Sequence, residues 1–246
     1  MKKFFSLMLS FVLIFSLSST AFAADINSTQ QNDFLPTVSY ESLPEAYPSN
    51  LISIESYPRT DGTGIDVFVG NLGIDGLDSV TISVTATDHS TAQTQTGYVP
   101  ILFGKTFSFD IPMTKCKMTY NIKVKVVDGT QTQNFNRTAK LEYSEDQLAS
   151  ISWDAGTFNS RQDSANYHFG VHHDDVGVDA ENMVQYMNLA LDTYNDTISN
   201  PNNYKIVAQA ERPNYKPAHK YTNKTNYRFI IYSDDSSKSI YTFGGK

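Results

Sequence analysis

Short runs in which apolar and polar residues alternate fill the middle of the chain and limit what it can fold into. Residues 80–86 read Val-Thr-Ile-Ser-Val-Thr-Ala, and residues 120–127 show the same two-residue period. That period places alternate side chains on opposite faces of an extended strand, whereas a helix needs apolar residues three or four positions apart. Similar runs, rich in β-branched and aromatic residues, lie at 51–57, 65–69 and 106–111. About seven short strands within residues 49–145 predict an antiparallel sandwich of the immunoglobulin-like type.

The N-terminal residues 1–23 have the layout of a secretory signal peptide. Two lysines precede an apolar stretch at 4–17, and two alanines occupy positions −3 and −1 before Ala24. This arrangement is typical of a cleaved export signal, and the apolar stretch is shorter than the ~20 residues of a transmembrane helix. We therefore expect a mature protein that is secreted without a membrane anchor. Residues 24–48 are polar and contain proline, so we expect a flexible lead-in there.

Composition excludes several classes of protein. The only cysteine, Cys116, leaves no partner for an internal disulfide and excludes a multi-cysteine metal centre. Lysines on both sides of Cys116 favour a lowered thiol pKa, whereas a position inside a strand favours an inert, packed side chain. The net charge of −7 argues against a polyanion-binding surface over the whole chain.

A different pattern follows the sandwich. Residues 180–194 carry apolar side chains at the spacing of an amphipathic helix, and Asp179 is positioned to cap its start. Residues 227–232 and 239–243 are typical of two strands. We therefore expect a separate α+β domain at 156–246, with helices first and a small antiparallel sheet after them. The predicted fold class is mainly β plus α+β.

Charge is divided unevenly within this C-terminal region. Residues 162–204 hold seven acidic residues and no Lys or Arg, whereas residues 205–246 hold eight basic and three acidic residues. Four tyrosines are interspersed with the basic residues, namely Tyr204, Tyr215, Tyr221 and Tyr227. Cations suit phosphates and rings suit bases, so the pattern favours nucleic-acid binding as much as an ordinary lysine-bearing surface.

The densest group of titratable residues lies at 167–175, with the sequence Tyr-His-Phe-Gly-Val-His-His-Asp-Asp. His168 and His172 are four residues apart, the spacing of two metal ligands on one helix face, and Asp174 or Asp175 would add a third ligand. The same histidines suit general acid–base chemistry without a metal. A solvated turn of histidines and carboxylates is the third interpretation.

Residues 166–190 resemble the HFxKHxxxxG…YxxxA opening of toxin-like domains secreted by bacteria. Residues 227–231 and 240–244 resemble the closing strands of those domains, which belong to the Barnase–EndoU–Colicin–RelE group of metal-independent ribonucleases. The likeness covers about a third of the chain. The preceding sandwich resembles, more loosely, domains found before such ends in exported proteins of Gram-positive bacteria.

The resemblance implies roles for individual residues. His172 matches the motif histidine and would transfer a proton, while Arg228 and Thr242 match polar positions on the two closing strands and would hold phosphate. The motif lysine is replaced by Val171. Candidates for the missing cation at the substrate are Lys216, His219 and Lys220.

Two functions remain open at this point. One is a secreted, cofactor-free and metal-independent endoribonuclease that cuts RNA and is restrained by an immunity protein. The other is a non-catalytic extracellular binding or surface-associated protein. A metal-dependent hydrolase that uses His168, His172 and Asp175 is a third and more distant interpretation.

Overall fold

The computed structural model describes most of the chain beyond the expected signal peptide. The described residues are 33–41, 52–71, 73, 77–87, 89–209 and 216–246. The expected signal peptide at 1–23 and most of the expected lead-in lie outside them. Residues 34–246 form one compact unit. Within the described part of the chain, no helix is long and apolar enough to cross a membrane.

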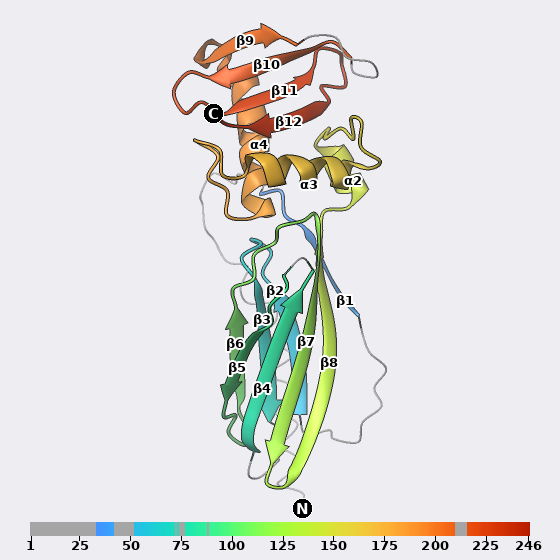
Figure 1. The fold of residues 1–246 in the computed structure, drawn as a ribbon, viewed down its shortest axis with the longest axis vertical. Helices are drawn as coiled ribbons and strands as arrows, with labels where there is room; N and C mark the ends of the chain where they lie inside the picture. The colour runs from blue at the N-terminus through green and yellow to red at the C-terminus, as the bar shows by residue number, and fades with distance from the viewer. Residues whose placement is uncertain (1–32, 42–51, 72, 74–76, 88, 210–215) are drawn as a thin grey trace, which may run out of the picture. The chain divides into compact units, whose positions relative to one another are not determined.

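Two antiparallel sheets face each other in the N-terminal half of this unit (Figure 1). One has the strand order β1-β8-β7-β4-β5 and the other has the order β2-β3-β6. The bounds are β1 Thr37–Glu41, β2 Ile52–Pro58, β3 Ile65–Asn71, β4 Leu77–Ala86, β5 Gln93–Gly97, β6 Gly104–Phe109, β7 Lys117–Asp128 and β8 Gln131–Glu142. The predicted fold class, β-rich with sandwich-like sheets followed by an α+β part, is confirmed.

The two-residue period of the sequence produces the core of the sandwich. Alternate residues of β7 are buried and exposed along most of its length, as expected for a sheet that packs on one face only. The core includes residues from both sheets that are fully buried, among them Ile65, Val67, Val69, Val80, Ile82 and Val84. Burial of such side chains contributes about 1.5–3 kcal/mol each.

β1 lies within the segment expected to be a flexible lead-in. It pairs with β8 in a ladder from Thr37↔Glu142 to Glu41↔Thr138. Just before it, the ring of Phe34 stacks on Tyr143 with centroids 4.8 Å apart. A polar, proline-bearing sequence therefore orders here because an existing strand edge offers hydrogen bonds to its backbone.

Side-chain amides join the two sheets along one edge. Gln93 of β5 donates through Nε2 to the carbonyl oxygen of Asp110, at 2.8 Å. Gln95, two residues later, donates in the same way to the carbonyl oxygen of Ser108. The two glutamines thus satisfy backbone acceptors along the outer side of β6.

The C-terminal half contains the helices and a third sheet with the order β12-β11-β10-β9 (Figure 1). The bounds are α2 Glu145–Ser150, α3 Arg161–His172, α4 Met183–Ser199, β9 Tyr204–Ala208, β10 Ala218–Asn223, β11 Phe229–Ser233 and β12 Ile240–Gly244, with a short 3₁₀ turn at Pro201–Asn203. α4 covers one face of the sheet, where Tyr186 packs on Phe243 and Tyr194 packs on Tyr232.

The start of α4 differs from the sequence expectation. Asn182 is the N-cap, because its side chain accepts a hydrogen bond from the backbone of Gln185. Asp179, the expected cap, has a positive φ of 46° and lies outside the helix. Both residue types cap helices well, so the choice depends on where the preceding loop fixes the backbone.

Trp153 holds the helices against the edge of the C-terminal sheet. It forms an isolated bridge with Ile240 of β12 and is 1 % exposed. Its indole N–H donates to Ser164 Oγ of α3, and its ring meets Tyr186 of α4 edge-on. Residues 145–155, which connect the two predicted domains, therefore pack with the C-terminal elements.

Two backbone hydrogen bonds connect the sandwich to the helices. The N–H of Cys116 donates to Asn166 Oδ1 of α3, and the N–H of Met183 donates to the carbonyl oxygen of Met113, both at 2.7 Å. The Cys116 thiol is free and buried, and burial raises its pKa. The thiol is therefore protonated at neutral pH and packs as a small apolar group.

We expect Trp153→Ala to lower the free energy of unfolding by about 3–5 kcal/mol, because it leaves a large cavity where three elements meet. Ile198→Ala is the control, since Ile198 lies on α4 but is 60 % exposed. Chemical denaturation monitored by circular dichroism measures both variants. Equal effects for the two substitutions would show that Trp153 does not have this structural role.

Candidate functional site

α3 carries two histidines to the edge of the C-terminal sheet. Glu145 accepts hydrogen bonds from the backbone N–H groups of Arg161 and Gln162 and so anchors the start of the helix. Further along the helix, His168 Nδ1 lies 2.9 Å from Thr242 Oγ1 of β12. The ring of His172 stacks parallel to that of His168, with centroids 6.0 Å apart.

A carboxylate just beyond α3 orients His172. His172 Nδ1 and Asp175 Oδ2 are 2.7 Å apart, and the same oxygen accepts the backbone N–H of Gly245. A carboxylate at Nδ1 keeps the proton on that nitrogen, which leaves Nε2 for chemistry. Gly244 allows this arrangement, because a Cβ there would lie 2.8 Å from His172 Cγ.

One face of the sheet is turned away from α4 and toward these histidines. Thr242, Ile231 and Lys220 are paired across β12, β11 and β10, so their side chains share a face. Phe229 lies two residues before Ile231 on the same face. Its ring meets His172 edge-on at 5.6 Å, and Lys220 Nζ lies 3.5 Å from its centroid.

Two aromatic residues, the exposed Tyr167 and the half-buried Phe158, extend the group at the other end. The ring centroid of Tyr167 is 5.2 Å from that of His168, and Phe158 follows at 5.1 Å from Tyr167. Tyr167 is 53 % exposed. Successive contacts thus connect six side chains, which we call the ring strip: Phe158, Tyr167, His168, His172, Phe229 and Lys220.

The two histidines have unlike surroundings. Burial, together with the nearby His172, lowers the pKa of His168 to about 4, so this ring is neutral at neutral pH. His172 instead has the carboxylate of Asp175 at 2.7 Å from its Nδ1. Burial also lowers the pKa of Lys220, and the charge of Asp175 opposes that shift. Unlike neighbouring titratable groups are typical of an acid–base pair.

The structure brings three of the residues proposed from sequence to this site. His172 and Lys220 belong to the ring strip, with Phe229 between them. Thr242 lies beside it, in contact with His168. These residues come from α3, β10 and β12, which are far apart in the sequence.

The other three residues make contacts elsewhere. Arg228 donates through Nε to the carbonyl oxygen of Gly177. His219 is paired with Tyr232 on the α4 side of the sheet, and its Nδ1 lies 2.7 Å from Asp234. Lys216 forms an ion pair of 2.5 Å with Asp235. None of these contacts joins the ring strip.

Several members of the site were not assigned these roles from the sequence. Asp175 was considered only as a metal ligand, although its spacing of three residues from His172 on a helix end was a usable signal. His168 was considered as a metal ligand and, with His172, for acid–base chemistry, but the ribonuclease resemblance assigned it no role. Phe229 and Tyr167 have no distinguishing sequence signal, since aromatic residues are common in cores and on surfaces alike.

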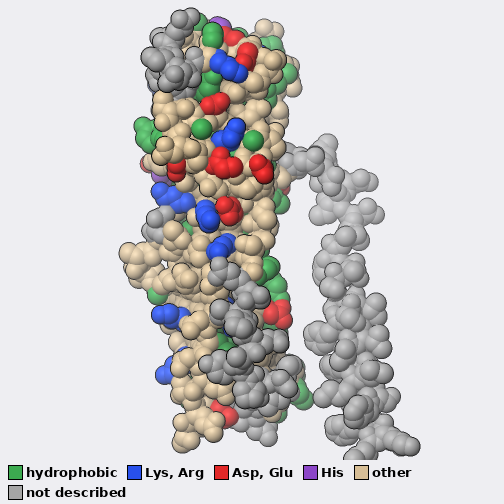
Figure 2. Space-filling view, turned by 90° about the vertical axis from the view of Figure 1, so that its right-hand side faces the viewer, with side chains coloured by type: hydrophobic (Ala, Val, Ile, Leu, Met, Phe, Trp, Pro, Cys, Tyr) green, Lys and Arg blue, Asp and Glu red, His purple; other side chains and the backbone are tan. Residues whose placement is uncertain are grey.

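The described residues contain no group of three His, Cys, Asp or Glu side chains placed to hold a metal ion. His168 Nδ1 faces Thr242, and His172 Nδ1 faces Asp175, so the two nitrogens point to different partners. Among the described basic residues of 205–246, Lys216 contacts Asp235 and Lys224 contacts the carbonyl oxygen of Asn202, both outside the ring strip. On the face shown in Figure 2, basic and acidic side chains are mixed.

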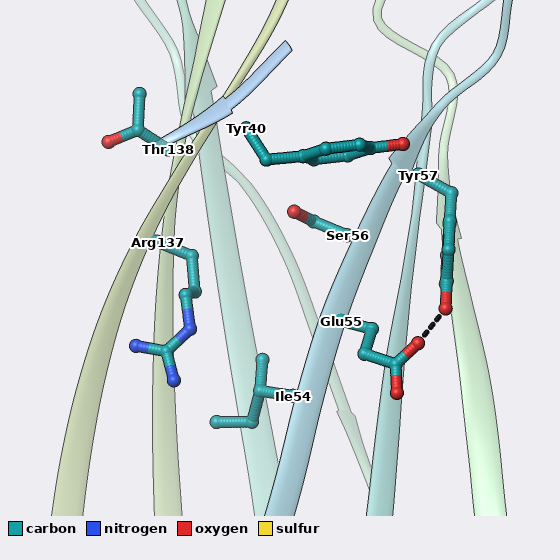
Figure 3. A pocket seen from close by; sticks show the side chains of 7 residues that line it. All are labelled: Tyr40, Ile54, Glu55, Ser56, Tyr57, Arg137 and Thr138. Atoms are coloured by element: carbon teal, nitrogen blue, oxygen red, sulfur yellow. Dashed lines mark hydrogen bonds between the residues drawn. The ribbon is translucent and has the colours of Figure 1, made fainter. Parts of the chain in front are cut away.

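A separate pocket lies in the sandwich, between β1, β8 and β2 (Figure 3). Its volume is about 310 Å³. Ile54 and Ser56 lie on the side of β2 that faces Tyr40 and Arg137. The hydroxyl of Tyr57 donates a hydrogen bond to the carboxylate of Glu55. Its charged lining residues are Glu55 and Arg137.

We expect Gly244→Ala to displace His172 and to lower stability by about 1–3 kcal/mol, because the new methyl group overlaps the imidazole. Gly170→Ala is the control. It adds a methyl group to open space on α3 and is expected to stabilise by about 0.5–1 kcal/mol. Histidine NMR titration and denaturation measure both effects. An unchanged His172 resonance in Gly244→Ala would contradict the close packing.

His168 makes stability depend on pH. Its pKa is about 6.5 when unfolded and about 4 when folded, so between these values the unfolded chain binds more protons. Lowering the pH from 6.5 to 4 should therefore destabilise the protein by up to about 3 kcal/mol through this group. His168→Gln should lose this part of the pH dependence. Identical stability profiles for the two proteins would mean that His168 titrates normally.

Comparison of the chain with protein-family models, with curated proteins and with solved structures gave no match.

Proposed function

We propose that the ring strip is the active site of a secreted, metal-independent endoribonuclease of the bacterial toxin-like type. The observation that carries the proposal is the pair of stacked histidines in unlike environments, with a lysine on the same side of the sheet. The sequence resemblance of residues 166–190 to such domains supports it independently. In that class a released toxin is accompanied by an immunity protein, and we propose the same partner here.

The chemistry is transesterification of RNA. Neutral His168 accepts the proton of a ribose 2′-hydroxyl, and the oxygen attacks the adjacent phosphorus. The bond from phosphorus to the 5′-oxygen breaks, and His172 in its imidazolium form donates a proton to that oxygen. The products are a 2′,3′-cyclic phosphate and a 5′-hydroxyl. Asp175 would hold the His172 ring through Nδ1, so that Nε2 faces the leaving oxygen.

Lys220 supplies the cation that the motif carries at position 171. Val171 is 46 % exposed on α3 and has no charge to offer. Lys220 reaches the same group of rings from β10, with Nζ over Phe229. A cation there would stabilise the negative charge that develops on the phosphate. Thr242 Oγ1 lies 2.9 Å from His168 Nδ1, which supports a role in holding that ring, and the same hydroxyl would contact a phosphate oxygen.

Tyr167 and Phe158 give the site a place for a base. Stacking of a base on an aromatic ring is worth about 1–3 kcal/mol and tolerates any sequence. Phosphate would lie at the Lys220 end of the ring strip and a neighbouring base at the Tyr167 end. The cation, the acid–base pair and the exposed ring thus follow one another in the same order as a phosphate, a ribose and a base in single-stranded RNA.

A second candidate function is non-catalytic binding outside the cell. The observation that favours it is the sandwich pocket, where Tyr40 and Tyr57 are 56 % and 45 % exposed. An exposed tyrosine, Tyr40, on the same side of β2 as the guanidinium of Arg137 suits recognition of a ligand without chemistry. The two functions are compatible if the sandwich binds while the C-terminal part cleaves.

We expect the purified chain from Ala24 onward to cleave single-stranded RNA in EDTA and to leave 2′,3′-cyclic phosphate ends. His172→Ala should reduce the rate by about 10²–10⁴-fold, the usual effect of losing a proton-transfer group. Lys220→Met should slow cleavage strongly, whereas its matched control Lys216→Met should not, because Lys216 is paired with Asp235. Gel assays with end-labelled RNA measure these rates.

Three results would contradict this proposal. One is the absence of cleavage of any RNA by a folded protein. Another is activity that EDTA abolishes and zinc restores, which would favour a metal-dependent hydrolase. The third is an equal loss of activity in Lys220→Met and Lys216→Met, which would show that Lys220 has no special role in the ring strip.

A further inference from the structure

The loop between β5 and β6, residues 98–103, carries an exposed apolar turn. Ile101, Leu102 and Phe103 are consecutive, and their side chains are 38 %, 71 % and 67 % exposed. Tyr98 at the start of the loop is 58 % exposed. Single exposed apolar residues are ordinary, but a contiguous group indicates an interaction surface. We call these four residues the apolar tip.

The backbone holds the apolar tip in a defined turn. The N–H of Phe103 donates to the carbonyl oxygen of Pro100, at 3.2 Å. Within this turn Leu102 has a φ of 61°, a value that favours glycine. The chain therefore carries a large apolar side chain at a position where the backbone conformation favours glycine.

A buried asparagine fixes both ends of the loop. The side-chain amide of Asn71 donates to the carbonyl oxygen of Val99, at 3.3 Å. Its backbone N–H donates to the carbonyl oxygen of Phe103, at 2.8 Å. The apolar tip is thus tied to the end of β3, so exposing it does not depend on local unfolding.

The strand register places the apolar tip away from the helices. Gly97, just before the loop, pairs with Val80 near the start of β4, where Leu77 also pairs with Asp128 at the end of β7. The sandwich residues that bond to the helical part, Met113 and Cys116, precede β7 and lie at the opposite end of the strands. The apolar tip is therefore free to meet a partner while the ring strip is occupied.

The charge around the loop favours one kind of partner. Residues 90–109 contain no Asp or Glu and one lysine, Lys105, in a chain whose net charge is −7. Two acidic residues of the described strands lie at the same end of the sheet. Asp78 is on β4, two residues before Val80, which pairs with Gly97, and Asp128 is on β7, which β4 separates from β5. Lipid headgroups attract lysine and disfavour carboxylates, and tyrosine, phenylalanine and leucine enter the headgroup–acyl boundary readily. A protein interface instead needs a broad patch with a polar rim.

We propose that the apolar tip inserts into the interface of a lipid bilayer and attaches the chain peripherally to a membrane surface. The four exposed side chains of the apolar tip enter the boundary region, and the exposed Lys105 remains at headgroup level. This attachment does not depend on the proposed ribonuclease function, because it uses the opposite end of the sandwich and needs no chemistry.

The test uses the chain from Ala24 onward, so that the apolar residues 4–17 cannot bind lipid themselves. Vesicles of phosphatidylcholine, with and without phosphatidylglycerol, are sedimented with the protein. We expect binding to both, with stronger binding when phosphatidylglycerol is present. Leu102→Gly should reduce the partition coefficient by about tenfold or more. This variant relieves the positive φ, so loss of folding cannot explain the result. Val207→Asp is the control, at an apolar residue 46 % exposed on β9.

A fluorescent probe distinguishes insertion from simple adsorption. Trp153 is the only tryptophan and is buried, so its emission stays constant on binding. Phe103→Trp should shift its emission to the blue and be quenched by brominated lipid, whereas Tyr40→Trp should not. Absence of binding, or binding that Leu102→Gly leaves unchanged, would overturn the proposal. Self-association that this variant abolishes would instead identify the apolar tip as a contact between two copies.

Discussion

Burial of one indole ring organises the C-terminal part of the protein. Trp153 meets Ile240 of β12, Ser164 of α3 and Tyr186 of α4, so it fixes both helices relative to the sheet edge. That arrangement brings α3 alongside β12 and places His168 against Thr242. Asp175 completes the site, because one of its oxygens joins His172 to the backbone of Gly245. The position of the histidines therefore depends on this packing, and the Trp153 ring itself meets His168 edge-on, with centroids 6.3 Å apart.

The sequence predicted the sheets well, because burial along a strand follows an alternation of apolar and polar residues that can be read directly from the sequence. The alternation in residues 80–86 and 120–127 corresponds directly to β4 and β7. Helix boundaries were less predictable: α4 begins at Met183 rather than 180, since Asn182 caps it. β1 was unpredictable for a different reason, because its order comes from pairing with β8 and not from its own composition.

The candidate site was only partly predictable. His172 and Thr242 had sequence signals, whereas Lys220 could not be distinguished from Lys216 or His219 before the register of β10 was known. Neighbouring residues of a strand point to opposite faces of the sheet. Lys220 therefore lies on the face of the ring strip, whereas His219 lies on the face covered by α4. Arg228 fits the sequence pattern of a phosphate ligand, yet the loop at Gly177 accepts its Nε–H. Tertiary contacts of this kind leave no trace in local sequence.

The two glutamines of β5 also make the edge of the sandwich sensitive to deamidation. Gln93 and Gln95 place amide donors against the outer carbonyl groups of β6, where a strand from another molecule would otherwise pair. Deamidation converts each donor into a carboxylate, which repels those carbonyl oxygens and releases the edge of the sheet. Slow hydrolysis of these two side-chain amides would thus open the edge of the sheet to pairing with a strand of another molecule, without any change to the core.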